Sequence, residues 1–561
     1  MAMATLLDKD VRAELAATVR AREQELQSMY AILNIGVPIN QLPVELLVEV
    51  FTHLQQGDLE LRWLDALRVC RHWFVVGSTA AKLWKNLNVS GSTNLLRTGL
   101  ARSRAAELNI SITPYMNTLL EVTGLINPHL HRLRTLELGM IPPKDLPAFA
   151  IFMENAMPSL QSLQVSINRV SGLEVALDLS PTRFPRLRDV DCSGVQILRN
   201  SAIASQLHKV IISDCLGKNP QLQTSALLDA ICNMRNTKEL LMQHVYVYDV
   251  ARALAVPAQN RVVLEQLEKV MIYTDGPLLK AILSVIVIPP TAAVSFICPF
   301  AANTSEGNAS SFYAVIPDDR RGLPILSQII AVRVTAMDSE HTFEGFNDDF
   351  EVCPSGVPCG APQLELSIVM RSEEDVDFSI PIGLDDLVHV FCDTPLEHLT
   401  IDTTLVVAAT SDWRTIFEAF PTLRTFSITV EQDDEISDVS LQLFSALDPG
   451  DIPAAALARG ASGERLLGAR ILDAVPCPAL RHLRIIGLGT PLNTDRLLDT
   501  AVTCLENRRR VLDRPGEGIR ELKLELDCHD DDAHFRRVQA AFETHLGPLV
   551  DVISYQTGDM W

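Results

Sequence analysis

One dense group of side chains near the C-terminal end of the sequence could ligate a metal ion. Its members are Asp527, Cys528, His529, Asp530, Asp531, Asp532 and His534. Carboxylate, thiolate and imidazole groups are the ligands that calcium and transition metals take in proteins. A short charged stretch directly after a predicted strand is more typical of a solvated loop, and we favour that interpretation.

A second candidate is the pair Cys353 and Cys359 in CPSGVPC. A structural zinc site usually needs two ligand pairs at a short distance, and no second pair follows this one. We interpret the segment as a loop with two incidental thiols. The acidic run Glu431–Asp438 is likewise expected to be a solvated loop. The sequence therefore predicts neither a metal nor a cofactor.

The sequence lacks the familiar catalytic and phosphate-binding motifs. It contains no G-x-x-x-x-G-K-[ST], no G-x-G-x-x-G after a predicted strand, no H-E-x-x-H and no G-x-S-x-G. These absences favour a protein that is not an enzyme. A hydrolase or transferase whose site assembles only in space is kept as a third hypothesis.

Bulk composition excludes several classes of protein. With 47% hydrophobic and 21% charged residues in 561, the chain has ample apolar surface to bury, so disorder does not fit. The formal charge of −22 argues against a nucleic-acid partner, because such a surface repels phosphates.

The chain is expected to be neither secreted nor embedded in a membrane. Its eleven cysteines are odd in number and scattered, and acidic residues interrupt the first twenty positions. The most apolar stretch, Ala281 to Phe300, is divided by Pro289 and Pro290 into pieces too short to span a bilayer. We predict a cytoplasmic or nuclear protein with reduced thiols.

Residues 5 to 34 favour a long amphipathic helix. One stripe recurs at helical spacing and is interrupted by Arg22; it consists of Leu15, Val19, Leu26, Met29 and Leu33. Two interpretations stay open. The stripe could form a short coiled-coil dimerisation arm, or the helix could lie on its own protein, and the interruption favours the second.

Residues 39 to 89 predict three short helices. Pro43 suits the first turn of the first helix, and a second apolar stretch continues to Trp73 and Phe74. A third presents Leu83 and Trp84. Helices this few cannot enclose much core alone, so part of their apolar surface is available to a partner.

This segment resembles the F-box family, in a style similar to the large fungal F-box families. The resemblance rests on four elements in order: Leu42-Pro43, Glu45-Leu46-Leu47, Val69-Cys70-Arg71-His72-Trp73 and Leu83-Trp84. A long linker, Gln55 to Asp65, departs from the family pattern and leaves the start of the second helix open.

The resemblance implies docking onto the Skp-type adaptor of a Skp–cullin–F-box ubiquitin ligase, and through it onto a cullin–RING ligase. The residues that it implies for adaptor binding are Leu42, Pro43, Leu46, Leu47, Val50, Phe51, Val69, Cys70 and Trp73. A hydrophobic surface with little charge also fits the centre of a stable interface.

Beyond residue 105 an apolar triplet recurs. It consists of three apolar positions, with two variable residues between the first and second and one between the second and third. The best copies begin at Leu133, Leu160 and Leu187, which are 27 residues apart each time. Further copies begin at Leu207, Leu267, Leu396, Leu423, Leu480 and Ile519, and weaker ones lie near Thr237, Thr291 and Ile329. Each triplet fits a short strand, and the residues between triplets supply a helix or loop that returns the chain to the same edge of the sheet.

The recurring triplets resemble leucine-rich repeats over roughly residues 100 to 550. The Asn or Cys that such repeats place three residues after the last apolar position is present as Asn168 and Cys215, whereas Ile141, Val195 and Leu488 do not fit. The expected fold class is α/β: an N-terminal three-helix F-box-like module, then an irregular solenoid with a curved parallel sheet and helices or loops on its convex side.

The predicted organisation has four parts. They are an amphipathic helix at 1–36, the F-box-like domain at 37–90, the repeat region at 91–552 with irregular inserts near 303–362 and 437–465, and a tail at 553–561.

A broad concave strand face suits a protein target. The positions predicted to line it are Glu137, Gln164, Asp191, Thr400, Ser427, Arg484 and Lys523. The leading hypothesis is a substrate-recognition subunit of a ubiquitin ligase. The alternative is a repeat scaffold that is not coupled to ubiquitination.

Overall fold

The computed structural model divides the chain into two compact units, Met1–Cys192 and Ser193–Trp561. Each unit is described by itself. The residues described are 9–56, 63–89, 93–113, 119–167, 175–196, 201–215, 224–245, 261–300, 312–317, 319–337, 340–347, 351–352, 358–370, 380–403, 408–430, 439–450, 475–489, 494–512, 518–527 and 532–557.

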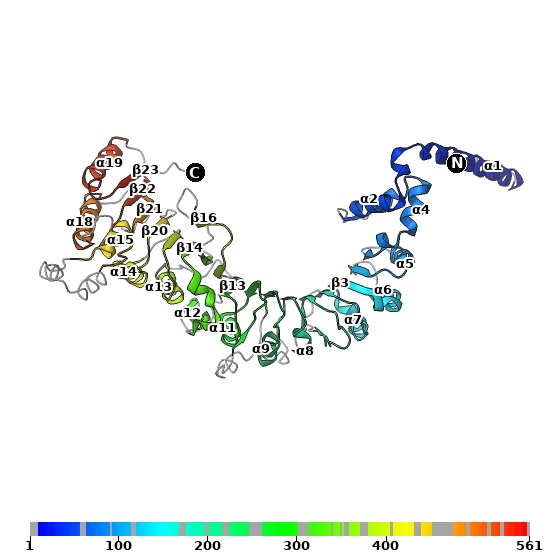
Figure 1. The fold of residues 1–561 in the computed structure, drawn as a ribbon, viewed down its shortest axis with the longest axis horizontal. Helices are drawn as coiled ribbons and strands as arrows, with labels where there is room; N and C mark the ends of the chain where they lie inside the picture. The colour runs from blue at the N-terminus through cyan, green and yellow to red at the C-terminus, as the bar shows by residue number, and fades with distance from the viewer. Residues whose placement is uncertain are drawn as a thin grey trace. The chain divides into compact units, whose positions relative to one another are not determined.

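Unit 1 begins with helices. In chain order they are α1 (Lys9–Ile35), η1 (Pro38–Gln41), α2 (Val44–Gln56), α3 (Trp63–Ala66), α4 (Arg71–Thr79) and η2 (Ala81–Trp84). Pro43 starts α2 as expected, because its carbonyl accepts the backbone N–H groups of Leu46 and Leu47. The predicted helices are therefore formed, with α3 and α4 sharing the second apolar stretch (Figure 1).

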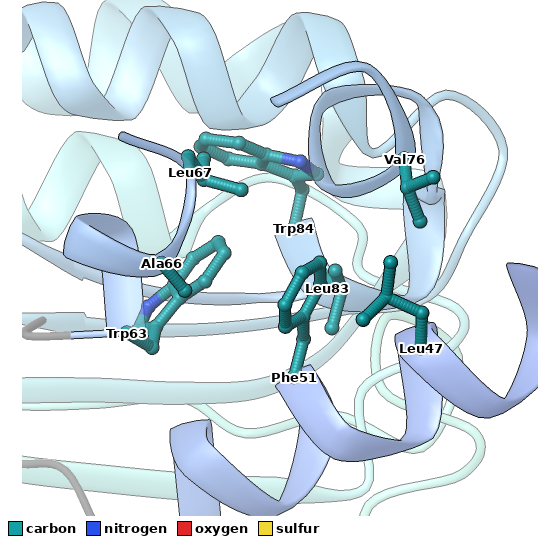
Figure 2. Packing of buried hydrophobic residues seen from close by; sticks show 8 residues of the cluster. All are labelled: Leu47, Phe51, Trp63, Ala66, Leu67, Val76, Leu83 and Trp84. Carbon is teal, nitrogen blue, oxygen red and sulfur yellow. The ribbon is translucent and has the colours of Figure 1, made fainter. Parts of the chain in front are cut away.

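The helices η1 to η2 form a small module with its own core. Figure 2 shows the buried side chains that make it: Leu47, Phe51, Trp63, Ala66, Leu67, Val76, Leu83 and Trp84. The indole rings of Trp63 and Trp84 meet edge to face at 5.3 Å. Gly77 lets the Leu67 side chain pack closely against α4, because a Cβ there would lie 2.1 Å from Leu67 Cδ2.

The rest of unit 1 alternates strands with helices. The strands are β1 (Asn86–Val89), β2 (Leu108–Ile112), β3 (Leu133–Ile141), β4 (Ser162–Ile167), β5 (Val175–Ala176) and β6 (Asp189–Ser193). The helices are α5 (Thr93–Arg102), α6 (Leu119–Ile126), η3 (Asn127–Arg132), η4 (Pro143–Asp145) and α7 (Leu146–Met153). Strands β1 to β4 pair in parallel, each with the next.

Unit 2 contains the larger number of strands. They are β7 (Val195–Gln196), β8 (Lys209–Ser213), β9 (Glu239–Gln243), β10 (Val262–Val263), β11 (Lys269–Tyr273), β12 (Ile286–Val287), β13 (Ala293–Phe300), β14 (Ala331–Met337), β15 (Glu340–Phe346), β16 (Glu351–Val352), β17 (Pro358–Cys359), β18 (Leu364–Met370), β19 (His398–Thr403), β20 (Thr425–Val430), β21 (His482–Gly489), β22 (Glu521–Asp527) and β23 (Val552–Thr557).

The helices of unit 2 lie along one face of its sheet (Figure 1). They are α8 (Ser201–Ala204), α9 (Thr224–Cys232), α11 (Gly276–Val285), α12 (Phe312–Val315), η5 (Arg320–Gly322), η6 (Pro324–Gln328), α13 (Ile380–Phe391), α14 (Thr410–Ala419), α15 (Val439–Leu447), α18 (Thr494–Leu512) and α19 (Asp532–Leu546). Consecutive helices contact each other, as α13 contacts α14 and α14 contacts α15.

The main sheet of unit 2 is almost entirely parallel. Its strands follow in the order β8, β9, β11, β13, β18, β15, β14, β19, β20, β21, β22 and β23. Only β15 runs against its neighbours β14 and β18 among the strands described in this sheet. Two strands of the sheet thus come from the segment near 303–362 that the sequence predicted to be an irregular insert.

The aliphatic triplets lie where a strand with one buried face needs them. Leu133, Leu136 and Leu138 are completely buried, and the copies beginning at Leu160 and Leu187 are equally enclosed. In unit 2, five first positions are also buried and each lies two residues before a strand: Leu207, Leu267, Leu396, Leu423 and Leu480. Thr291, at the start of a weaker copy, is exposed. The repeated triplets therefore mark the positions of strands.

Two boundaries differ from those expected. Strand β23 runs to Thr557 and pairs with β22, so the predicted tail from 553 begins inside the last strand. Helix α15 occupies the start of the predicted insert at 437–465, because Leu443 and Phe444 pack into the core. Much of that insert, together with Cys353 and residues 528–531, lies outside the described residues.

Candidate functional site

Apolar side chains gather on the outside of the helical module. Leu46 on α2 is 53% exposed, and Val69, in the turn before α4, is 61% exposed. Phe74 and Val75 on α4 are about half exposed as well. A module this small buries one apolar stripe of α2 and leaves the adjacent stripe in water, which provides an apolar surface for a partner.

The predicted adaptor-binding residues divide into two groups. Pro43, Leu46 and Val69 are exposed, and four more are half-buried: Leu42, Val50, Cys70 and Trp73. Leu47 and Phe51 are completely buried, so they form the interior of the module and not its surface. That corrects the expectation that both side chains contribute to the outer face, because the helix turns them toward Trp84 and Leu83 (Figure 2).

Sequence reasoning missed two exposed apolar residues, Phe74 and Val75. Both follow Trp73 directly and fall on the outer side of α4. The apolar run from Trp73 to Val76 was the available signal, but a run without polar positions does not reveal which side of a helix faces inward.

Hydrogen bonds fix η1 onto the module. The indole Nε1–H of Trp73 donates to Asn40 Oδ1 at 2.6 Å, and Asn40 Nδ2 donates to the Asn34 carbonyl at 2.7 Å. The Trp73 ring also meets Phe51 edge to face at 5.2 Å. Trp73 therefore holds together α4, α2 and the segment that leads back to α1.

Charged groups stand at the margin of the apolar surface. Lys82 Nζ lies 3.0 Å from Glu49 Oε2, and this hydrogen bond lowers the pKa of Glu49. The Arg102 guanidinium stands over the rings of Trp84, at 4.7 Å, and Phe74, at 5.7 Å. The module thus carries one ion pair and one cation–π contact beside its exposed apolar groups, a combination also found in interfaces with an apolar centre and a polar rim.

The positions predicted to line the strand face stand in register within each unit. In unit 1, Glu137 on β3 pairs with Gln164 on β4, and Asp191 lies on β6. In unit 2 the four predicted positions form one row across consecutive strands: Thr400, Ser427, Arg484 and Lys523.

Two members of that row do not reach solvent. Thr400 and Ser427 are almost completely buried. Each is short and stands in register beside a long side chain, Arg333 for Thr400 and Arg484 for Ser427. The expectation of an accessible side chain therefore fails at these two positions, whereas Arg484 and Lys523 are partly exposed.

A charged group on β14, β15 and β19 extends the same row. Arg333 Nε lies 2.8 Å from Asp402 Oδ2, and its Nη1 lies 3.8 Å from Glu344 Oε2. Burial raises the pKa of Glu344, and the carboxylates of Glu365 and Asp402 add to this, whereas Arg333 opposes it. Sequence reasoning missed this group because β14 and β15 fell in the presumed insert.

The parts of the chain that the structure describes contain no cluster of three or more His, Cys, Asp or Glu side chains able to hold a metal ion. Of the C-terminal candidates, Asp527 ends β22 and Asp532 and His534 begin α19, while Cys528 to Asp531 lie outside the described residues. No described helix has both the length and the hydropathy to cross a membrane.

Comparison with known proteins agrees with the geometry of the helical module. Residues 39–90 match the family model described as F-box-like. No curated protein matches the chain. The matched range begins in η1 and ends just after β1, so it encloses the buried core and the exposed apolar surface described above. Residues 39–90 are therefore an F-box-like domain, which suggests a substrate-adaptor role in ubiquitin ligation.

Proposed function

We propose that the protein is the substrate-recognition subunit of a Skp–cullin–F-box ubiquitin ligase. The F-box-like domain binds the Skp-type adaptor and thereby a cullin–RING ligase. The remaining chain is a leucine-rich-repeat solenoid that binds a protein target on its strand face. In this role the protein has no catalytic site of its own and works in the cytoplasm or nucleus, where it brings the target close to the chemistry of other subunits.

The observation that carries this proposal is the exposed apolar surface of the F-box-like domain. F-box domains generally bind Skp1-type adaptors. Leu46, Val69, Phe74 and Val75 provide uncharged area of the kind found at the centre of stable interfaces. The buried residues beneath them, Leu47 and Phe51, hold that surface in shape.

Repeating hydrogen bonds support the solenoid. A hydroxyl two or three residues before a strand donates to a carbonyl one repeat earlier in the chain in three places: Ser159 to His131, Thr237 to Leu207, and Thr422 to Leu396. Their separations of 28, 30 and 26 residues are close to the 27-residue spacing of the first three triplets.

The side chain of Cys215 supports the solenoid as well. It is buried, and its thiol donates to the Val195 carbonyl at 3.2 Å. A side chain at this position of a leucine-rich repeat can satisfy a backbone group of the turn, and the Cys215 thiol does so here.

Co-purification with a Skp-type adaptor tests the adaptor assignment. Leu46→Asp combined with Val69→Asp places two charges on the apolar surface without touching the core, and capture should be lost. A matched control, Leu120→Asp with Ile151→Asp, alters two exposed apolar residues on α6 and α7, 69% and 66% exposed. Capture that survives the first pair would remove the assignment and favour a repeat scaffold not coupled to ubiquitination.

The target-binding part has a separate test. Arg484→Ala with Lys523→Ala should deplete the proteins that co-purify with the wild-type chain, while adaptor capture stays intact. An unchanged set of co-purifying proteins would move the target site away from this row.

A further inference from the structure

The apolar stripe of α1 is not covered by the described part of the chain. Every residue from Val11 to Leu33 is exposed, and the aliphatic side chains among them are between 48% and 70% exposed. The favoured expectation that this helix packs on its own protein is therefore wrong for the residues described. What remains is a helix of 27 residues whose apolar face is exposed to solvent.

The stripe has the spacing of a coiled-coil seam. Its positions alternate at intervals of three and four residues, namely Arg12, Leu15, Val19, Arg22, Leu26, Met29 and Leu33. Val19, Leu26 and Leu33 occupy the a positions of the heptad, and Leu15, Arg22 and Met29 occupy the d positions. The helix holds more than three heptads, about 40 Å of seam at the usual rise per residue.

We propose that α1 pairs with α1 of a second copy of this chain in a parallel, in-register coiled coil. The whole chain carries a charge of −22, so two copies repel each other over most of their surfaces. The helix α1 differs, because its charges balance: Lys9, Arg12, Arg20 and Arg22 against Asp10, Glu14, Glu23 and Glu25. This neutral segment is where two copies can approach.

The distribution of charge along α1 selects the parallel orientation. All eight charged residues lie before Leu26, and the last ten residues, Leu26–Ile35, carry none. A parallel pair places these apolar segments against each other, with Tyr30 and Ile32 at the flanks of the seam. An antiparallel pair would place the same segment against the charged half of the partner helix, where it would have to desolvate Arg12 and its neighbours.

Arg22 fits this arrangement because acidic residues flank it. Its Nη1 lies 2.6 Å from Glu25 Oε2, one turn along the helix. Glu25 and Glu23 occupy the g and e positions, which border the seam. In a parallel, in-register pair the two Arg22 side chains therefore lie at one level among four carboxylates. The guanidinium still costs stability there, as polar seam residues do, and fixes the register.

The pairing would carry through to the F-box-like domain. Asn40 joins the Asn34 carbonyl near the end of α1 to the indole of Trp73 in α4. Two copies joined along α1 would thus hold two F-box-like domains at the same end of the coiled coil.

The molar mass of the purified full chain, measured by sedimentation, tests the pairing. The wild-type protein should sediment as a dimer, about twice the 61.9 kDa of one chain. Val19→Asp with Leu26→Asp should raise the dissociation constant at least about a hundredfold, because two charges enter the seam. The control Ala17→Asp with Gln24→Asp makes a change of the same size on the opposite face and should leave the dimer intact.

A third variant should strengthen the dimer instead of weakening it. Arg22→Leu should tighten the dimer about tenfold, because it removes the costly charge from the seam. A monomeric wild-type chain, or a dimer insensitive to Val19→Asp with Leu26→Asp, would overturn the proposal. Loss of adaptor capture by Val19→Asp with Leu26→Asp, in a chain that is monomeric as wild type, would also overturn the proposal. The adaptor would then be the partner that binds the stripe.

Orientation is tested by oxidation of Leu26→Cys. Equivalent a positions face each other in a parallel pair, so this variant should form a disulfide-linked dimer, whereas Ala17→Cys on the outer face and the wild-type chain should not. Cross-linking of Leu26→Cys no greater than that of the two controls would exclude the in-register parallel arrangement.

Discussion

The F-box-like domain and the sheet of unit 2 differ in which side chains they bury and which they leave exposed. The domain encloses a core of eight buried side chains, rich in aromatic rings, and leaves Leu46 and Val69 in water. The sheet buries its aliphatic triplets completely, and along its central row near Arg333 and Asp402 it presents polar and charged groups instead. Under the proposed function, the apolar surface would suit a constant partner, and the polar row would discriminate among targets by charge and hydrogen bonding.

The two regions also differ in how they use buried polar groups. In unit 2, Arg508 is almost completely buried, and its guanidinium donates to the carbonyls of Leu447, Pro476 and Cys477. His341 is buried there as well, beside the ring of Phe343. The core of the F-box-like domain consists of apolar side chains, with Trp84 Nε1 donating to the Gly77 carbonyl.

Removal of the Phe51 ring should have the largest effect and should remain local. Phe51→Ala leaves a cavity beneath the apolar surface and should destabilise the F-box-like domain by about 3–5 kcal/mol. Adaptor capture and the unfolding transition of this domain report the loss. Leu46→Ala, on the same helix but exposed, should change stability by less than about 0.5 kcal/mol. Equal effects of the two substitutions would contradict the assignment of inner and outer faces.

Arg508→Ala tests the buried polar anchor of unit 2. It leaves three buried carbonyls without their donor and should cost at least about 3 kcal/mol in denaturant unfolding. Its neighbour Arg509 donates to the Pro548 carbonyl from an exposed position, so Arg509→Ala is the control and should cost little. A loss confined to the F-box-like domain would show that the two regions are not separable.

His341 should make unit 2 sensitive to acid. Burial lowers the pKa of His341 from 6.5 to about 4, so the folded state favours the neutral imidazole. This contribution is present above pH 6.5 and is lost as pH falls toward 4, on the order of 3 kcal/mol. His341→Phe should flatten the stability profile of unit 2 across that window. A slope that persists in the variant would assign the acid sensitivity to other groups.

Asp402→Asn should produce the smallest effect. It removes the charge that pairs with Arg333 at 2.8 Å on the partly exposed strand face, and the cost should be about 1 kcal/mol. High salt should reduce the difference between the variant and the wild type. A much larger cost would mean that the row contributes to folding as strongly as the core does.

Much of the architecture could be predicted from local patterns. Leu42-Pro43 and Leu83-Trp84 bracket the F-box-like domain, and the triplets that start at Leu133 and Leu480 mark strands, because strand alternation and helix capping depend on neighbouring residues. Those signals need no knowledge of distant contacts.

The remaining features depend on packing between distant segments. Leu46 and Leu47 are adjacent and equally apolar, and Leu47 faces inward because it packs into the cluster that Val76, Leu83 and Trp84 supply from later in the chain. Thr400 is buried although its position on the strand predicts exposure, and it stands in register with Arg333 on another strand. The exposed stripe of α1 likewise depends on what the rest of the chain leaves uncovered.

The placement of β15 affects how unit 2 can assemble. Because β18 pairs with β13 while β14 and β15 lie between them in sequence, Val294 must meet Leu364, which is 70 positions farther along the chain. Strands such as β8, β9 and β11 join neighbours only about 30 positions away. Loop closure of the longer kind slows folding. The centre of unit 2 should therefore fold last, and hydrogen exchange during refolding should protect the amides of β13 and β18 after those of β9.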